Sequence, residues 1–305
     1  MNTRRNTIAI AVLLVAAFTG SVLSLNGVEA ARGRQATLEE ILYIPSAKAL
    51  KRMGLGYSGV LADIYWTRAV QYYGQKLATR RPDLRYDLLY PLLDITTDLD
   101  PHLIVVYEFG SVFLSQRPPV GAGQPDKAVA LLEKGIRNNP DYWRLYFDLG
   151  CIQYFDRKDY KAAQEAFEKG SENPKSLIWM KTMAASMAER ANDPETALNL
   201  WTRLYETASD EMVKQNAVQH IEGLRADHEV LELEQRVKMY QQRTGRLPSN
   251  WYEMMHEGLL AQVPMDPADK PYKLMPDGTV QVEDPDSIPF LTKGIPPGWK
   301  KSTKP

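Results

Sequence analysis

The sequence predicts an all-α fold, an α-solenoid of helix pairs, followed by a small C-terminal α+β module that contains a hairpin. Two observations predict the array of pairs. A pattern of large and small residues recurs along the middle of the chain with a period near 34 residues, and a proline falls at the end of most units. The composition, with 44% hydrophobic and 25% charged residues, is that of a folded protein.

Residues 1–30 are expected to be a targeting segment. Arg4 and Arg5 precede residues 8–25, which carry no charge, and residues 28–30 offer a small-residue cleavage pattern. The segment is either a cleaved signal peptide or an uncleaved membrane anchor, because the uncharged run is just long enough to span a bilayer. Both alternatives place the rest of the chain outside the cytoplasm. We therefore expect a periplasmic protein, either free or anchored in the inner membrane by residues 8–25.

The clearest unit of the array is residues 141–174. Each of its halves carries apolar and small residues at helical spacing, Trp143, Tyr146, Leu149, Gly150 and Tyr154 in the first and Ala163, Phe167 and Gly170 in the second. The polar run Asp156 to Asp159 separates the two halves, and Pro174 closes the unit. Small residues on one helix that face large ones on the other are what a closely packed helix pair requires.

Three further units complete the array. The four units are predicted at 58–101, 102–140, 141–174 and 175–208, of which the first is the most degenerate and the second has a longer turn around Pro118. One pair cannot bury its own apolar face, so at least three must stack for stability. Residues 31–57 are predicted to be a tether that leads into the array.

This pattern resembles the signature of the tetratricopeptide repeat (TPR) family, in which aromatic residues, Leu-Gly, Ala and Pro recur at fixed positions. The resemblance covers about half of the chain. It implies stacked pairs that curve into a right-handed superhelix, with an inner wall made by the first helices of the pairs. It also implies that the partner is a protein or a peptide segment.

The same resemblance implies which side chains line the groove. They are Tyr107, Leu114, Arg144, Phe147, Tyr154, Phe155 and Trp179. The set is aromatic and lightly charged, which suits an extended or helical peptide held by aromatic anchors. The alternative is that several of these aromatic residues are core between repeats.

Residues 209–244 are expected to form capping and connecting helices after the array. The apolar stripe shifts at residues 226–228, which indicates a kink or a break there. Residues 245–284 are expected to form a small module. Residues 285–305, which contain several prolines and three late lysines, are expected to be a disordered tail.

The module at 245–284 reads Gly-x-x-Pro, short helix, Pro-x-Asp-Pro, Pro-Tyr and an Asp-Gly hairpin signal at Asp277-Gly278. This order resembles the globular end of the type II secretion major pseudopilin, although the pilin's apolar assembly helix is missing. In pilin relatives the loop can hold calcium, which implies oxygen ligands here from Asp266, Asp269, Asp277 and Asp284. The alternative, a solvated acidic loop without metal, is the interpretation we adopt.

The sequence carries no motif for catalysis or for a cofactor. Its four histidines show no metal-ligand spacing, and no G-x-S-x-G, P-loop or G-x-G-x-x-G occurs. The single cysteine, Cys151, excludes an internal disulfide and is expected to act as a small buried hydrophobe. The net charge of −1 provides no basic excess for phosphates, so nucleic acid is not an expected partner. We predict a protein that is not an enzyme, with no cofactor and no small-molecule substrate.

The predicted function is a protein-interaction scaffold or adaptor of the cell envelope. It would hold a partner segment in the groove and contact the membrane through its N-terminus if that segment is not cleaved. Two alternatives stay open. One is an accessory subunit of a pilus or secretion assembly, suggested by the C-terminal module, and the other is a structural envelope protein that self-associates.

Overall fold

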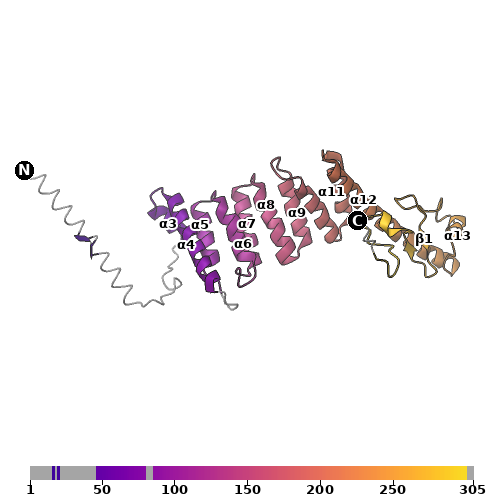
Figure 1. Ribbon diagram of the computed structural model, residues 1–305, viewed down its shortest axis with the longest axis horizontal. Coiled ribbons are helices and arrows are strands. Elements are labelled where there is room, and N and C mark those ends of the chain that lie inside the picture. Colours follow the sequence, from indigo (N-terminus) through magenta and orange to yellow (C-terminus); the bar gives the residue numbers. More distant parts are fainter. Residues whose placement is uncertain (1–15, 18, 21–45, 80–84, 301–305) are drawn as a thin grey trace, which may run out of the picture. The chain divides into compact units, whose positions relative to one another are not determined.

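The computed structural model describes residues 16–17, 19–20, 46–79 and 85–300 (Figure 1). The predicted signal peptide or anchor therefore lies outside the described residues, except at 16–17 and 19–20. In the part of the chain that is described, no helix is long and apolar enough to cross a membrane. The chain divides into two compact units, Met1–Lys127 and Ala128–Pro305.

The described part of the first unit is helical. It contains α3 (Ala47–Met53), α4 (Ser58–Thr79), α5 (Leu89–Leu99) and α6 (Ile104–Ser115), and α7 (Pro125–Asn138) crosses from the first unit into the second. Helix α5 packs against α4 on one side and α6 on the other. It supplies much of the core, because Leu89, Leu92 and Leu93 are fully buried. From α3 to α6 each helix thus packs against the next one along the chain, as stacked helix pairs require.

The second unit continues this order. It contains α8 (Trp143–Ile152), the π-helical turn η1 (Gln153–Arg157), α9 (Tyr160–Ser171), α10 (Trp179–Arg190), α11 (Pro194–Thr207) and α12 (Glu211–Thr244). From α8 to α12 each α-helix packs against its successor. These pairs confirm the predicted fold class.

Short polar turns separate the helices because aspartates cap the following helix. Asp159, Asp193 and Asp210 accept hydrogen bonds from the main-chain N–H groups of Ala162, Thr196 and Met212. Pro194 follows Asp193 at the first helical position, where its fixed φ suits the helix and no N–H is needed. Each turn therefore ends one helix and starts the next within a few residues.

Helices α8 and α9 approach closely at Gly150. A Cβ atom at this position would lie 2.6–2.7 Å from ring carbons of Phe167 in α9, and Phe167 is fully buried. Gly170 of α9 similarly lies against Met180 of α10 and Tyr146 of α8. The alternation of small and large residues in the sequence therefore corresponds to real close contacts between neighbouring helices.

Helix α12 runs without interruption through 34 residues, so there is no break at residues 226–228. The apolar stripe shifts there because the two halves of α12 face different partners. Ala217 and Ile221 belong to the core that includes α11, whereas Val230 and Val237 belong to the core of the C-terminal module. The change of packing partner explains the shift of the apolar stripe.

The C-terminal module packs against the second half of α12. It contains α13 (Trp251–His256) and an antiparallel hairpin of β1 (Lys273–Leu274) and β2 (Val280–Gln281), with Lys273 opposite Gln281. Gly278 adopts a φ of +85°, which the predicted Asp-Gly turn requires. The buried indole of Trp251 donates a hydrogen bond from Nε1 to the Tyr272 carbonyl at 2.7 Å, which connects α13 to the hairpin.

Residues 285–300 are not a disordered tail, contrary to the prediction. After a 3₁₀ turn at Pro285–Ser287, residues 289–294 lie against α12, and we call them the strap. The Gly294 carbonyl accepts a hydrogen bond from Val282 N at 2.8 Å, and Asp227 of α12 accepts bonds from the strap. Residues 301–305 lie outside the described residues.

Candidate functional site

Helices α8 and α10, the first helices of two successive pairs, join their side chains into one surface. The rings of Phe147 in α8 and Trp179 in α10 meet edge to face, with centroids 4.9 Å apart. Toward the C-terminal ends of the same helices, the Arg190 guanidinium of α10 lies 5.5 Å from the ring centroid of Tyr154. We call Phe147, Tyr154, Phe155 and Trp179 the aromatic surface.

The most accessible member of the aromatic surface is Phe155, which is 57% exposed. Tyr154 and Phe155 lie in the π-helical turn η1, and their ring centroids are 4.4 Å apart. This turn continues α8 and ends at Lys158, whose left-handed backbone with φ of +57° stops the helix. Leu177 and Ile178, just before Trp179, are also exposed, so apolar side chains continue at the start of α10.

Charged groups of both signs lie around the aromatic surface, the carboxylates of Asp148 and Asp156 among them. The Lys158 ammonium and the Arg190 guanidinium both lie over the Tyr154 ring, at 5.8 and 5.5 Å from its centroid. Arg144 of α8 is exposed and lies over Trp143. Each such contact at an exposed site is worth about 0.5–1 kcal/mol. These cation contacts hold the Tyr154 and Trp143 rings in place.

Cys151 lies among these residues but is a poor nucleophile. Burial, followed by the nearby carboxylates of Asp148 and Asp156, raises the pKa of its thiol to about 12. A thiol with so high a pKa is protonated at neutral pH, and only the thiolate reacts as a nucleophile. Cys151 therefore contributes packing to the aromatic surface.

The structure separates the seven predicted groove residues into two groups. Arg144, Phe147, Tyr154, Phe155 and Trp179 belong to α8, η1 and α10 of the second unit and are exposed or half-buried. In contrast, Tyr107 and Leu114 of α6 are fully buried, and the Tyr107 hydroxyl donates a hydrogen bond to the Pro101 carbonyl. These two side chains are core residues of the first unit and offer no surface to a partner.

The exposed apolar side chains of α6 are Phe109 and Val112, which the sequence analysis did not select. Aligning Phe109-Gly110 with the Leu-Gly positions of the repeat signature assigns Phe109 to the core. Within α6 the buried positions are instead Val106, Tyr107, Gly110, Ser111, Leu114 and Ser115. These buried positions recur every three or four residues, so Phe109 and Val112 fall outside the buried stripe of α6. The same spacing can be read from the sequence.

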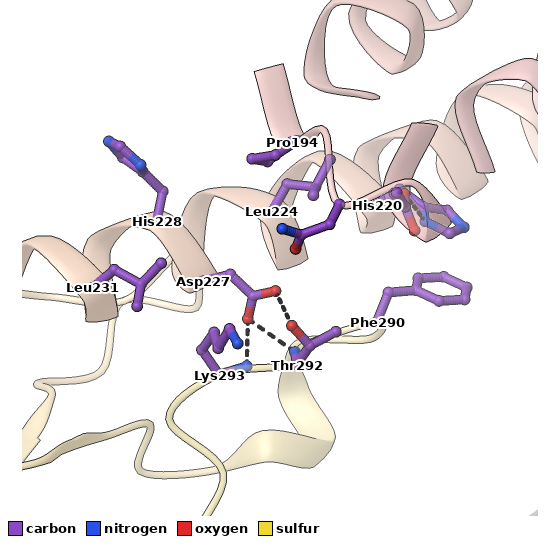
Figure 2. A pocket seen from close by; sticks show the side chains of 11 residues that line it. Pro194, His220, Leu224, Asp227, His228, Leu231, Phe290, Thr292 and Lys293 are labelled. Atoms are coloured by element: carbon purple, nitrogen blue, oxygen red, sulfur yellow. Dashed lines mark hydrogen bonds and ion pairs between the residues drawn. The ribbon is translucent and has the colours of Figure 1, made fainter. Parts of the chain in front are cut away.

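A pocket of about 150 Å³ lies beside α12, between the turn that precedes α11 and the strap (Figure 2). Pro194, Leu224 and Leu231 supply its apolar wall, and Asp227 and the strap supply polar groups. Small-molecule sites usually measure about 300–1,000 Å³. The pocket suits a single side chain better than a whole metabolite.

Next to the pocket, three rings form a stack. The His220 ring lies between Trp201, with centroids 4.0 Å apart, and Phe290 of the strap, with centroids 3.6 Å apart. One carboxylate oxygen of Glu189 accepts a hydrogen bond from Trp201 Nε1 at 2.5 Å and lies 2.7 Å from His220 Nδ1. A carboxylate can only accept, so Nδ1 carries the proton in this contact. Glu189 thereby fixes the orientation of both rings.

The strap is attached to α12 through main-chain and side-chain contacts (Figure 2). Asp227 accepts hydrogen bonds from Thr292 N at 2.8 Å, Thr292 Oγ1 at 2.5 Å and Lys293 N at 2.6 Å. A Cβ on Gly223 would lie 2.9 Å from the Pro289 carbonyl oxygen, so glycine admits the strap backbone here. Phe290 has a φ of +66°, which costs a non-glycine residue about 1–2 kcal/mol.

Three of the four aspartates compared with the calcium ligands of pilin relatives have protein partners. Asp284 pairs with the Lys270 ammonium at 2.7 Å, and Asp277 accepts hydrogen bonds from Thr279. Asp266 accepts bonds from the main-chain N–H groups of Ala268 and Lys270. Across the described ranges, no group of three or more His, Cys, Asp or Glu side chains is arranged to hold a metal ion.

Comparisons with known proteins bear on the fold alone. No protein-family model matches the chain, and no curated protein matches it. Among solved structures the chain is similar to YrrB, described as "a TPR protein with an unusual peptide-binding site", at 15% identity and a TM-score of 0.33. That match covers 50% of this chain and 75% of YrrB. The assignment to helix-pair repeats rests on the helices of this chain.

Proposed function

We propose that this chain is a non-enzymatic protein-interaction protein that binds a partner segment on the aromatic surface. The observation that supports the proposal is the exposure of Phe155, together with half-buried Tyr154, Phe147 and Trp179 on the same face of α8 and α10. Contiguous exposed aromatic side chains mark interaction sites, because covering them removes apolar area from water.

The chemistry of the aromatic surface favours a segment with apolar anchors. Covering the exposed part of Phe155 contributes about 1–2 kcal/mol. The rim carries Arg144, Lys158 and Arg190 as well as the carboxylates of Asp148 and Asp156, so it can pair with charges of either sign beside the anchors. Because these charges are at the rim, they contribute mainly to association rate and salt dependence.

The test is a binding measurement with a matched control. A peptide selected from a random display library on the wild-type protein is titrated against Phe155→Ala and against Phe155→Ala with Tyr154→Ala. We expect at least tenfold weaker binding, since aromatic hot spots contribute about 2 kcal/mol or more. The control is Tyr205→Ala, because Tyr205 is 45% exposed on α11, the second helix of its pair, and we expect less than twofold change.

If the folded double variant bound the selected peptide as tightly as the wild type, the aromatic surface would not be the binding site. Circular dichroism at 222 nm checks folding of each variant. A larger loss for Tyr205→Ala than for Phe155→Ala would place the site on the second helices instead.

We further propose that the protein acts outside the cytoplasm as an envelope adaptor, which rests on residues 1–30 alone. Arg4 and Arg5 followed by uncharged residues 8–25 support export, with or without cleavage near Ala31. Fractionation and N-terminal sequencing of the native protein test this. A mature N-terminus near Ala31 supports a signal peptide, and an intact chain in the membrane fraction supports an anchor. An intact chain in the cytoplasmic fraction contradicts both.

A further inference from the structure

A cleft of about 300 Å³ is lined by residues of α7, α8, η1 and α9, all of them in the second unit. This volume lies at the lower end of the range for small-molecule sites. The floor of the cleft is apolar and is formed by Ile136, Leu149, Ala162 and Ala166. None of the four residues of the aromatic surface lines it, so the cleft is a separate site.

The polar group at one end of the cleft is the side-chain amide of Gln153. Gln153 is 6% exposed, and its buried Oε1 has no hydrogen-bond partner among the described residues. A buried amide without a partner costs free energy, because it has given up its hydrogen bonds to water and gained none. Half a turn of the amide exchanges its oxygen and its nitrogen, so it can present either an acceptor or a donor to the cleft. The cleft therefore contains an unused hydrogen-bonding group.

Charged side chains line the rest of the cleft in a definite order. Short turns reverse the chain after α7 and after η1, so α7 and α9 run in the same direction beside α8. The C-terminal ends of α7 and α9 therefore lie near Tyr146 at the start of α8, and they bring Arg137 and Lys169 there. Glu133 and Glu165 precede these two cations by one turn on the same helices.

The lining thus runs from an amide through carboxylates to cations. Gln153 lies two turns beyond Tyr146, which is about 10 Å along the helix. In the described part of the chain, none of the four charged side chains of the lining forms an ion pair. The carboxylates of Asp141 and Glu172 also act on Tyr146, but they lie outside the lining.

We propose that this cleft binds a free α-amino acid whose side chain ends in an amide, of which glutamine is the natural example. The ligand's amide pairs with the Gln153 amide, its ammonium group with Glu133 and Glu165, and its carboxylate with Arg137 and Lys169. Its methylene groups lie on the apolar floor. Two carboxylates and two cations in the lining match a ligand that carries both charges. This site goes beyond the proposed function and does not depend on the aromatic surface.

The experiment is titration calorimetry on the full chain with L-glutamine as the probe. We expect saturable binding to the wild type and at least about tenfold weaker binding to Gln153→Met, which keeps the length of the side chain and removes the amide. Without ligand, Gln153→Met should be at least as stable as the wild type, because it removes an unpaired buried polar group. The control is Lys161→Gln, on α9 outside the cleft, with less than about twofold change.

A second variant and a second ligand test the two ends of the site separately. Arg137→Gln with Lys169→Gln removes both cations from exposed positions and should weaken L-glutamine at least about tenfold. This variant also decides the question if Gln153→Met does not fold. L-Norvaline, which has a methyl group in place of the amide, should bind the wild type at least about tenfold more weakly than L-glutamine.

Four results overturn the proposal. They are no saturable binding of L-glutamine to the folded wild type, undiminished binding to either variant, equal affinity for L-norvaline, and a loss of stability in ligand-free Gln153→Met, which would assign the amide a structural role. If alanyl-glutamine binds and free L-glutamine does not, the occupant is a peptide end, and the assignment to a free amino acid is overturned.

Discussion

Replacing Gly150 with alanine is expected to destabilise the second unit, although alanine is the better helix former. The gain in helix propensity is about 1 kcal/mol. Against it, the new Cβ would lie 2.6–2.7 Å from three ring carbons of Phe167, which is fully buried. Overpacking of this kind costs about 1–3 kcal/mol. We expect a net loss of about 1 kcal/mol, equivalent to a fall in Tm of about 2–4 °C.

Thermal and urea unfolding followed by circular dichroism measure this loss. Gly74→Ala in α4 is the control, because a Cβ there meets nothing within 4 Å and the residue is exposed. It is expected to stabilise its unit by about 0.5–1 kcal/mol. Combining Gly150→Ala with Phe167→Leu should recover part of the loss, because the two sites are in contact. A Gly150→Ala variant that gains stability as Gly74→Ala does would refute the close packing of α8 on α9.

Three further predictions concern single side chains. Hydrogen bonds from Arg246, Ser249 N and Tyr240 lower the pKa of Glu253 from 4.5 to about 2. The contribution of Glu253 to stability is therefore fully present above about pH 4.5 and is lost as the pH falls toward 2. The free energy of unfolding, measured over that pH range, should depend less on pH in Glu253→Gln than in the wild type. Burial holds the pKa of Cys151 at about 12, so iodoacetamide at pH 8 should label this thiol slowly in the folded protein and quickly in urea. Equal labelling rates in the two conditions would contradict the burial of Cys151. Glu189→Gln removes the carboxylate that orients the Trp201 and His220 rings and is expected to cost about 1–3 kcal/mol, with a change in tryptophan fluorescence. Unchanged unfolding of that variant would show that the Glu189 contacts contribute nothing.

Local signals in the sequence predicted the helix pairs. The glycine at 150 and the phenylalanine at 167 marked a close contact, and the Asp193-Pro194 dipeptide marked the start of α11. Each of these signals depends on residues within about one repeat, where periodicity and capping chemistry are visible. The same holds for the hairpin, because its turn is specified by the neighbouring residues Pro276, Asp277 and Gly278.

Features that depend on distant residues were not predictable. The strap is attached through a contact between Thr292 and Asp227, which are 65 positions apart in the sequence. No local pattern near either residue predicts this contact. The continuity of α12 also depends on distant residues. Its apolar stripe shifts where its packing partner changes, and the sequence shows the shift but not the partner. For the candidate site, the repeat signature selected Tyr107 and Leu114, which pack inward from α6.

The most direct test of the account is photo-crosslinking from the aromatic surface in the native host. A benzophenone amino acid replaces Phe155, which is 57% exposed, in one variant and Tyr205, which is 45% exposed, in the other. The account predicts a discrete crosslinked protein from position 155 and none from position 205. No discrete adduct at position 155, or the same adduct from both positions, would contradict it.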